Sequence, residues 1–529
     1  MEGGQGEVIA RGEREDREIR DAVARFGGDN DGRRAHVLVR FVLLRLLGLV
    51  YLGAFTSAAR EVAPLLGPRG LLPARLVLEG AVAQEGSTWR AFMSLPTIFF
   101  ATGASDGALT AVAWVGALLA AAVLAGVTHA GVMVALWALY LSIANVGQTF
   151  WGFGWDIQLL ETGLLAAFLC PWKTLRPFPP HGPPAPAIWL HRWLVVRVML
   201  GAGLIKLRGD PCWRDLTCLV FHYETQPSPS YASFLLHPMP EWFHRVGVGF
   251  NHFVELAVPI AAFGPRVARL SAGTLFVVFQ IGLIVSGNLS FLNWLTMVPA
   301  IACFDDAALR RVLPRGLLAM ADRGTRTQRP SRPALWAAIG WTAIVAFLSL
   351  PVVGNLMSRR QAMNRSYGSL HLVNTYGAFG SVNRERLEVI LEGTADVVAD
   401  EGAHWKEYAL PCKPGPIDRR PCQITPLHLR LDWQAWFLTF GGVEQAPWFV
   451  SWVDQLLRGE LGTKKLIAID PFPDAPPRWI RATTYRYEMV PYGDDPGVWW
   501  RRYRVGPFMR PVRKDDPDIR AYLEGYGLR

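Results

Sequence analysis

Long apolar stretches recur along the chain as far as residue 357, separated by short polar connections. A helix that crosses roughly 30 Å of hydrocarbon needs about 20 apolar residues, so the pattern predicts about nine membrane spans. The stretches at 156–171 and 291–303 are short, and we expect them to be re-entrant or packed against neighbouring helices. The predicted spans are 37–57, 108–128, 131–150, 156–171, 186–206, 248–264, 267–287, 291–303 and 333–357.

Beyond residue 357 apolar and polar positions alternate, at 387–391, at 427–433 and at 485–489. Alternation of this kind is typical of half-buried strands. The amphipathic run WFVSWVDQLLRG predicts one helix that stops at Gly459. The chain is therefore expected to have three regions, which are a polar cytoplasmic tail (1–36), a multi-helix transmembrane domain (37–357) and a soluble, mostly β domain (358–529).

The composition agrees with a membrane protein. Hydrophobic residues make up 51% of the chain and charged residues 19%, which is too apolar for an ordinary soluble protein of this length. The polar first 36 residues lack the pattern of a cleavable signal peptide, so the first apolar segment is expected to remain as an anchor. The net charge of +10 is spread among the apolar spans. Nucleic acid binding would need a clustered basic face, so the expected surroundings are membrane lipid and protein.

Arginines in the connections predict the orientation, because basic residues near span ends are held on the cytoplasmic side. With nine spans and a cytoplasmic N-terminus, the Arg-rich connection 304–332 lies inside, and residues 358–529 lie outside the cytosol. The connection 58–107 carries four arginines on the opposite side and argues against this topology.

The stretch GAGLIKLRGDPCWRDLTCLVFHYETQ, residues 201–226, is charged, aromatic and cysteine-bearing, which predicts an ordered loop against the mouth of the bundle. In the predicted topology Cys212, Cys218, Cys412 and Cys422 lie in an oxidising compartment. We expect a disulfide between Cys412 and Cys422. For Cys212 and Cys218 the sequence leaves open a disulfide, free thiols or an exchange-active pair. Their spacing fits no standard zinc pattern, so no metal is predicted.

Ionisable residues within the apolar stretches must face one another or a wet cavity, because each costs roughly 2.5 kcal/mol or more against lipid at mid-bilayer. His252 and Glu255 stand three positions apart on one face of a predicted helix, which indicates a polar cavity near Lys206. Three alternatives follow, namely a structural ion-pair cluster, a base at Lys206, or a binding pocket without chemistry. The residues concerned are Asp156, Glu161, His191, Arg197, Lys206, His252 and Glu255.

Asn288, Asn293 and Trp294 place polar groups in the otherwise apolar stretch SGNLSFLNWLTMVPAIACFDD. Such side chains commonly form hydrogen bonds between helices, each worth about 1 kcal/mol. We expect them to hold the bundle together.

These stretches resemble the signature blocks of the lipase maturation factor family. The blocks are GAGLIKLRGDPCWRDLTCLVFHYETQPSP, NHFVEL, SGNLSFLNWLTMVPAIACFDD, VNTYGAFGSV and RRPCQITPLHLRLDWQAWF. Their candidate site residues are Arg208, Asp210, Trp213, His222, Glu224, Asn288, Asn293 and Trp294. The resemblance implies an endoplasmic reticulum membrane protein that helps secreted homodimeric lipases, such as lipoprotein lipase, to fold, with no cofactor. In a bacterium, the corresponding place is the inner membrane, with the β domain in the periplasm.

A second resemblance points to a different class of protein. AGLIKL, residues 202–207, is similar to a stretch of vitamin K-dependent carboxylase-type membrane proteins, in which a lysine acts as base on the quinol. By that resemblance, Lys206 would be the base of a quinone-redox or carboxylase-type enzyme. We favour a maturation factor for exported client proteins over this enzyme alternative.

Overall fold

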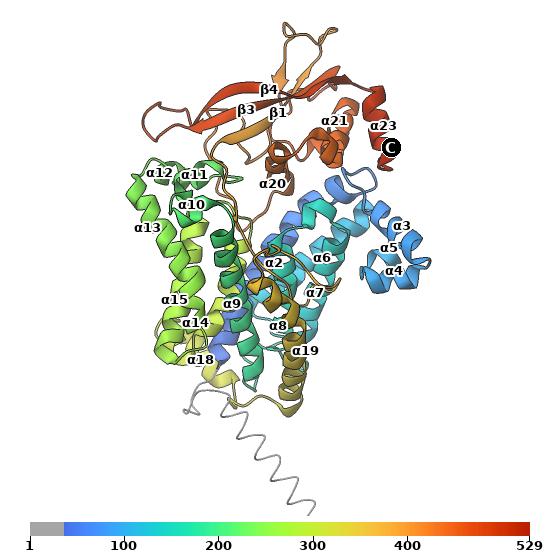
Figure 1. The fold of residues 1–529 in the computed structure, drawn as a ribbon. Helices are drawn as coiled ribbons and strands as arrows, with labels where there is room; N and C mark the ends of the chain where they lie inside the picture. The colour runs from blue at the N-terminus through green and yellow to red at the C-terminus, as the bar shows by residue number, and fades with distance from the viewer. Residues whose placement is uncertain (1–35) are drawn as a thin grey trace, which may run out of the picture.

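The first part of the structure is a bundle of helices. The computed structural model describes residues 36–529, so the predicted tail lies almost wholly outside the described residues. Within the described range, five helices are long and apolar enough to cross a membrane. They run roughly side by side (Figure 1). These helices are α2 (Val37–Leu66), α6 (Asp106–Ala125), α9 (Ala185–Arg208), α15 (Arg266–Ser286) and α19 (Arg332–Met357).

The other four predicted spans are helical but shorter, so they do not by themselves show further crossings. The segment at 248–264 lies in a helix that begins earlier and is continuous through a π-helical turn. These shorter elements are α7 (Ala130–Val146), α8 (Gly154–Ala167), α13 (Glu241–His252) with η2 (Phe253–Ala257) and α14 (Val258–Ala261), and α16 (Leu292–Ala300) with η3 (Ile301–Cys303).

Small residues let the first two long helices approach closely. A Cβ on Gly48 of α2 would lie 2.8 Å from the backbone nitrogen of Leu124, and one on Gly116 of α6 would meet the ring of Phe55. Close approach at small residues is a usual way for membrane helices to pack. Short helices connect the long ones, and they are α3 (Ala74–Glu85), α4 (Thr88–Ser94), α5 (Phe99–Thr102), η1 (Gln148–Trp151), α10 (Pro211–Arg214), α11 (Cys218–Thr225), α12 (Tyr231–Leu236), α17 (Asp306–Leu309) and α18 (Arg315–Gly324).

A four-stranded antiparallel sheet lies beyond one end of the bundle, opposite α18 (Figure 1). Its strand order is β2-β1-β3-β4, and Glu388 of β1 pairs in register with Tyr485 of β3. The strands predicted at 387–391 and 485–489 are therefore confirmed. The strands are β1 (Arg386–Thr394), β2 (Lys406–Glu407), β3 (Trp479–Met489) and β4 (Trp500–Arg513).

The strand predicted at 427–433 is wrong, because the chain enters a helix at Arg430. Residues 430–435 are all buried, so the apolar alternation there does not mark one wet and one dry face. Several further helices make this part of the chain mixed rather than mostly β, although the predicted helix ending at Gly459 is present. They are α20 (Arg430–Trp436), η4 (Phe437–Phe440), η5 (Val443–Gln445), α21 (Pro447–Arg458), α22 (Leu461–Lys464) and α23 (Pro517–Gly525).

Residues 358–385, here called the connecting segment, contain neither helix nor strand and pack against the bundle. A Cβ on Gly201 of α9 would lie 2.3 Å from the backbone oxygen of Tyr376, so this segment sits directly on the helix. Gln361 donates a hydrogen bond from its side chain to the Gly201 carbonyl at 2.9 Å. The sheet region is thus attached to the bundle along the length of this segment.

Candidate functional site

Lys206, in the last turn of α9, meets Asn251 and Glu255 of the α13–η2 helix. Its Nζ lies 2.6 Å from Glu255 Oε1 and 2.9 Å from Asn251 Oδ1. Asn251 in turn donates to the second carboxylate oxygen of Glu255 at 2.8 Å. All three side chains are buried. Each carboxylate oxygen therefore has a donor, and the buried charges form a closed, neutral cluster.

His252 is not part of this cluster. The π-helical turn Phe253–Ala257 contains Glu255 and inserts an extra residue into that turn of the helix. Asn251 and Glu255 then face α9, while His252 Nε2 lies 2.9 Å from the carbonyl oxygen of Trp213. Single π turns inside α-helices often occur at functional sites. Regular helical spacing predicts His252 beside Glu255. That spacing cannot show that the π turn directs the His252 side chain toward Trp213 instead.

Trp213 covers the free side of the lysine, and His222 lines the same cavity. Lys206 Nζ lies 4.9 Å from the centre of the Trp213 ring, within range of a cation–π contact. The Trp213 indole donates to the carbonyl oxygen of Phe379 at 2.8 Å. Burial and the nearby Lys206 charge lower the pKa of His222 to about 4, so its imidazole is neutral near pH 7.

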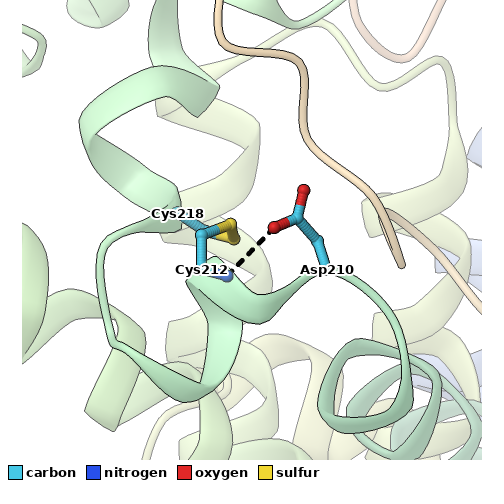
Figure 2. A group of neighbouring side chains, drawn as sticks. All are labelled: Asp210, Cys212 and Cys218. Atoms are coloured by element: carbon cyan, nitrogen blue, oxygen red, sulfur yellow. Dashed lines mark hydrogen bonds between the residues drawn. A yellow bond between two sulfur atoms is a disulfide. The ribbon is translucent and has the colours of Figure 1, made fainter.

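Cys212 and Cys218 are joined in a disulfide that closes the loop after α9, with a Cα–Cα distance of 4.8 Å (Figure 2). Asp210 accepts from the Cys212 backbone N–H at 3.0 Å and from Arg384 at 2.8 Å. Burial raises the pKa of Asp210, but hydrogen bonds from Arg384 and the backbone outweigh it and hold the pKa below its usual range. Ligand atoms of Asp210 and the two cysteines lie within 4.8 Å of one another. Sulfurs joined to each other offer no thiolate to a metal.

Cys412 and Cys422 form the second disulfide, with a Cα–Cα distance of 5.6 Å. It lies beside the polar residues of the 286–306 stretch. Asn288 donates to the Cys422 carbonyl at 3.0 Å and accepts from the Ile424 N–H at 2.8 Å. Trp294 donates to Thr425 Oγ1 at 3.0 Å. These two residues thus bind the C-terminal part of the chain.

The remaining signature residues also make contacts between distant parts of the chain. Glu224 accepts from the backbone N–H of Met489 in β3 at 2.7 Å, and Arg208 donates to Gln361 of the connecting segment at 2.6 Å. Asn293 differs, because its amide donates to Gln280 of α15 at 2.7 Å and stays within the bundle. Most of the signature blocks therefore build the junction between the bundle and the C-terminal region.

Two buried ion pairs lie at this junction. The sequence indicates Asp156, Glu161 and Arg197 as charges that need partners, but it does not indicate Arg430. Arg430 of α20 pairs with Asp156 of α8 at 2.9 Å. Arg197 of α9 pairs with Glu161 of α8, whose carboxylate also accepts from connecting-segment residues Asn374 and Tyr376 at 3.1 and 2.7 Å. A charge within an apolar stretch was the only signal, and it identifies the need for a partner without naming it.

A cavity of about 980 Å³ adjoins the Lys206 cluster. Its walls come from the bundle, from α11, from the connecting segment and from α20 with η4. The wall is mostly apolar and aromatic. A cavity is therefore present near Lys206, as predicted. Its wall is mainly apolar rather than polar, and the charged cluster occupies only one part of it.

Together these features define a helical membrane protein whose extramembrane sheet region is locked onto one end of the bundle. Two family models match the chain, the lipase maturation factor transmembrane domain over residues 38–311 and the lipase maturation factor C-terminal domain over residues 372–510. The chain belongs to the lipase maturation factor family.

Curated relatives resemble the chain over nearly its whole length. It is 45% identical to human lipase maturation factor 1, over 93% of this chain and 90% of the relative, and 46% identical to the mouse protein of that name, over 90% and 88%. Human lipase maturation factor 2 is 30% identical, over 93% of this chain and 85% of the relative. No solved structure matches the chain.

Proposed function

We propose that this chain is a membrane-bound factor that helps exported lipases to fold and assemble. The observation that carries the proposal is the match of both family domains, in order, together with relatives that are named lipase maturation factors. The signature residues build the buried junction between the two domains, so their role in this proposal is to hold the domains in one arrangement. Secreted lipases, including homodimeric ones, are the expected clients.

The sheet region is proposed to lie outside the cytosol. Both disulfides are in or beside it, as an oxidising compartment favours. The Arg-rich connection that contains α18 lies at the opposite end of the bundle (Figure 1). That distribution fits the tendency of basic connections to remain cytoplasmic. The compartment is the endoplasmic reticulum in a eukaryote and the periplasm in a bacterium.

Client contact is proposed for exposed apolar side chains of the C-terminal region. Val397 and Val398, in the loop between β1 and β2, are 72% and 62% exposed. Neighbouring exposed apolar side chains can bind unfolded or partly assembled protein, because the contact removes apolar surface of both partners from water. A matched apolar residue at the other end of the molecule is Val312, which is 75% exposed.

The test is secretion of a homodimeric lipase from cells that lack their own maturation factor. Restoring the full chain should raise secreted lipase activity, and Val397→Asp with Val398→Asp should lower it several-fold at equal abundance of the factor. Val312→Asp is the control, and cells with this variant should secrete as much lipase activity as cells with the wild-type factor. If the full chain, correctly inserted and abundant, does not raise active lipase, the proposed function is wrong.

The enzyme alternative gains no support from the geometry. Lys206 donates to both Asn251 and Glu255, and its remaining side faces Trp213. A general base must present a free lone pair to its substrate. An ammonium group held in a buried ion pair is instead arranged to fix two helices together.

A further inference from the structure

The cavity beside Lys206 opens toward the side of the bundle. Its lining includes Phe250 of α13, Val278 and Gly282 of α15 and Phe440 of η4, all of them exposed at the molecular surface. α15 is one of the membrane-length helices, and the exposed parts of such helices face lipid. The opening therefore has an apolar and aromatic rim on a bilayer-facing helix, where a lipid could enter sideways.

The size and wall of the cavity fit a lipid rather than a small polar metabolite. At about 980 Å³ it lies at the upper end of the roughly 300–1,000 Å³ of ligand pockets. Met199, Leu283 and Phe437 are among the apolar side chains along it. Such a wall keeps an acyl chain out of water as the bilayer interior does, so the chain can move from the bilayer into the cavity at little cost in hydrophobic free energy.

The charges in the cavity wall indicate which kinds of lipid headgroup can bind there. Among the lining residues, Lys206 and Glu255 carry the only formal charges, and they neutralise each other at 2.6 Å. An anionic phosphate or carboxylate headgroup would need an unpaired cation, and the wall offers none. A buried charge without a partner is costly.

Uncharged hydrogen-bonding groups remain available at the wall. His222 is only 8% exposed, and its ring makes no hydrogen bond within residues 36–529. Asn293 donates to Gln280, while its carboxamide oxygen accepts no hydrogen bond from any described residue. Both residues line the cavity, so each offers it hydrogen-bonding capacity that no other described residue uses. Hydroxyl groups and ester carbonyls have the complementary donors and acceptors.

We infer that this cavity binds one neutral acylglycerol, such as a diacylglycerol, whose acyl chains occupy the apolar part and whose hydroxyl and ester groups hydrogen-bond at His222 and Asn293. The site is formed jointly by the bundle, the connecting segment and η4. An occupied cavity would fill the space between the two family domains with lipid. This inference stands apart from the lipase role, since it concerns what the chain itself binds.

The experiment uses the full chain in nanodiscs of phosphatidylcholine that contain a trace of a diacylglycerol with a photoreactive acyl chain. Irradiation followed by peptide mapping should place cross-links on segments that line the cavity, around residues 199, 283 and 437. The same photoreactive chain carried on phosphatidylcholine or phosphatidic acid should label those segments at least fivefold less. Equal labelling by all three lipids would show annular contact and overturn the proposal.

Gly282→Trp provides the matched blocking variant. A Cβ at Gly282 meets nothing within 4 Å, so a large side chain can be attached there, and tryptophan is expected to narrow the mouth. Gly340 on α19 is exposed and equally free of neighbours, so Gly340→Trp is the control. Cavity labelling should fall at least fivefold in Gly282→Trp and should stay unchanged in Gly340→Trp. Unchanged labelling in both variants would also overturn the proposal.

His222→Phe tests the headgroup contact while keeping the volume of the ring. It should narrow the difference between diacylglycerol and phosphatidylcholine labelling. A photoreactive apolar peptide serves as the competing occupant. If that peptide labels the cavity segments and excess diacylglycerol does not displace it, the cavity is a client-binding groove and the lipid proposal fails.

Discussion

Arg430 and Asp156 lie 274 residues apart in the chain and form an ion pair in which both side chains are fully buried. The Arg430 backbone N–H also donates to Glu61 of α2 at 2.9 Å. A helix of the C-terminal region is thereby fixed to two helices of the bundle. The junction is electrostatic as well as apolar.

Breaking this pair on one side should be severe. Removing one partner of a buried ion pair leaves an unpaired charge and typically costs about 3–5 kcal/mol. Arg430→Met and Asp156→Leu should each lower the apparent melting temperature in detergent, and the double variant should lose less than the sum of the two. The control is Arg69→Met, because Arg69 is 82% exposed and 3.8 Å from Glu460, where about 0–1 kcal/mol is expected. Additive losses would contradict the pairing.

Lys206 and Glu255 should behave as a structural pair. Lys206→Met leaves the Glu255 carboxylate buried with only Asn251 as a partner, so the melting temperature should fall. Combining Glu255→Gln with Lys206→Met removes the unpaired charge and should recover part of that loss. Lipase secretion per folded molecule should remain near the wild-type value in the double variant. A loss of about 100-fold or more in secretion at normal folding would instead point to acid–base chemistry.

The cysteines should divide into two groups. Mass spectrometry of the alkylated, unreduced protein should find Cys212 linked to Cys218 and Cys412 linked to Cys422, with the buried Cys170 and Cys303 unlinked. Replacing Cys412 and Cys422 together by serine should destabilise the fold by about 2–3 kcal/mol, the loop-closure value for a short loop. A fully reduced set in protein from its native compartment would contradict the proposed orientation.

Asp432 gives a pH dependence whose sign is fixed by its burial. Burial raises its pKa from 3.8 to about 6, although backbone N–H groups of Lys413 and Cys412 oppose the rise. Ionisation in the folded state is therefore unfavourable, so its contribution to stability is complete below about pH 4 and is lost as the pH rises through 6. The difference between these two pKa values corresponds to a change of about 3 kcal/mol in the free energy of unfolding.

Asp432→Asn should remove this contribution, so the melting temperature of the variant relative to the wild type should rise between pH 4 and pH 7. Asp515 is the opposite control. Hydrogen bonds from Arg458 and Arg529 lower its pKa to about 2, so its contribution is present above about pH 4 and lost on acidification. Parallel melting curves for Asp432→Asn and wild type across this range would show that the carboxyl is not buried as described.

Asp306 should act as a cap for a helix elsewhere in the chain. Its carboxylate accepts from the N–H groups of Val37 and Leu38 at 2.9 Å, at the start of α2, where His36 supplies no side-chain cap. Asp306→Ala should cost about 1–2 kcal/mol, and Asp306→Asn less. Asp322→Ala, at an exposed ion pair, should be nearly neutral. Equal melting of Asp306→Ala and Asp322→Ala would refute the cap.

Apolar length predicted the long helices well, because crossing hydrocarbon imposes a local requirement that α2, α9 and α15 each satisfy alone. It predicted less well where the fold depends on distant partners. Leu427 to Trp433 alternates like a strand, yet Arg430 reaches Asp156 and the chain turns into α20. Alternation of apolar and polar residues predicts a strand with one exposed face. It cannot show that other parts of the chain cover both faces of the segment.

The site shows the same division. Isolated charges in apolar stretches need partners, so the sequence indicates Lys206 and Glu255, and the structure places them together. The predicted position of His252 beside Glu255 is wrong, because the π turn changes which way the side chains face without changing their spacing in the sequence. Asn374 and Tyr376 fall in the signature block VNTYGAFGSV, but nothing in the sequence indicates that they contact Glu161, because these contacts cross more than 200 positions.

The connecting segment has a practical consequence for anyone who recombines this chain with a relative. Its residues complete the Glu161 cluster, and Arg430 beyond it completes the pair with Asp156. A chimera cut at the end of α19 would separate Glu161 from Asn374 and Tyr376, and Asp156 from Arg430, even though the cut falls between helix and loop. Exchanges that carry α8, α9 and residues 361–436 together keep these groups matched, so the unit that must be exchanged spans both domains.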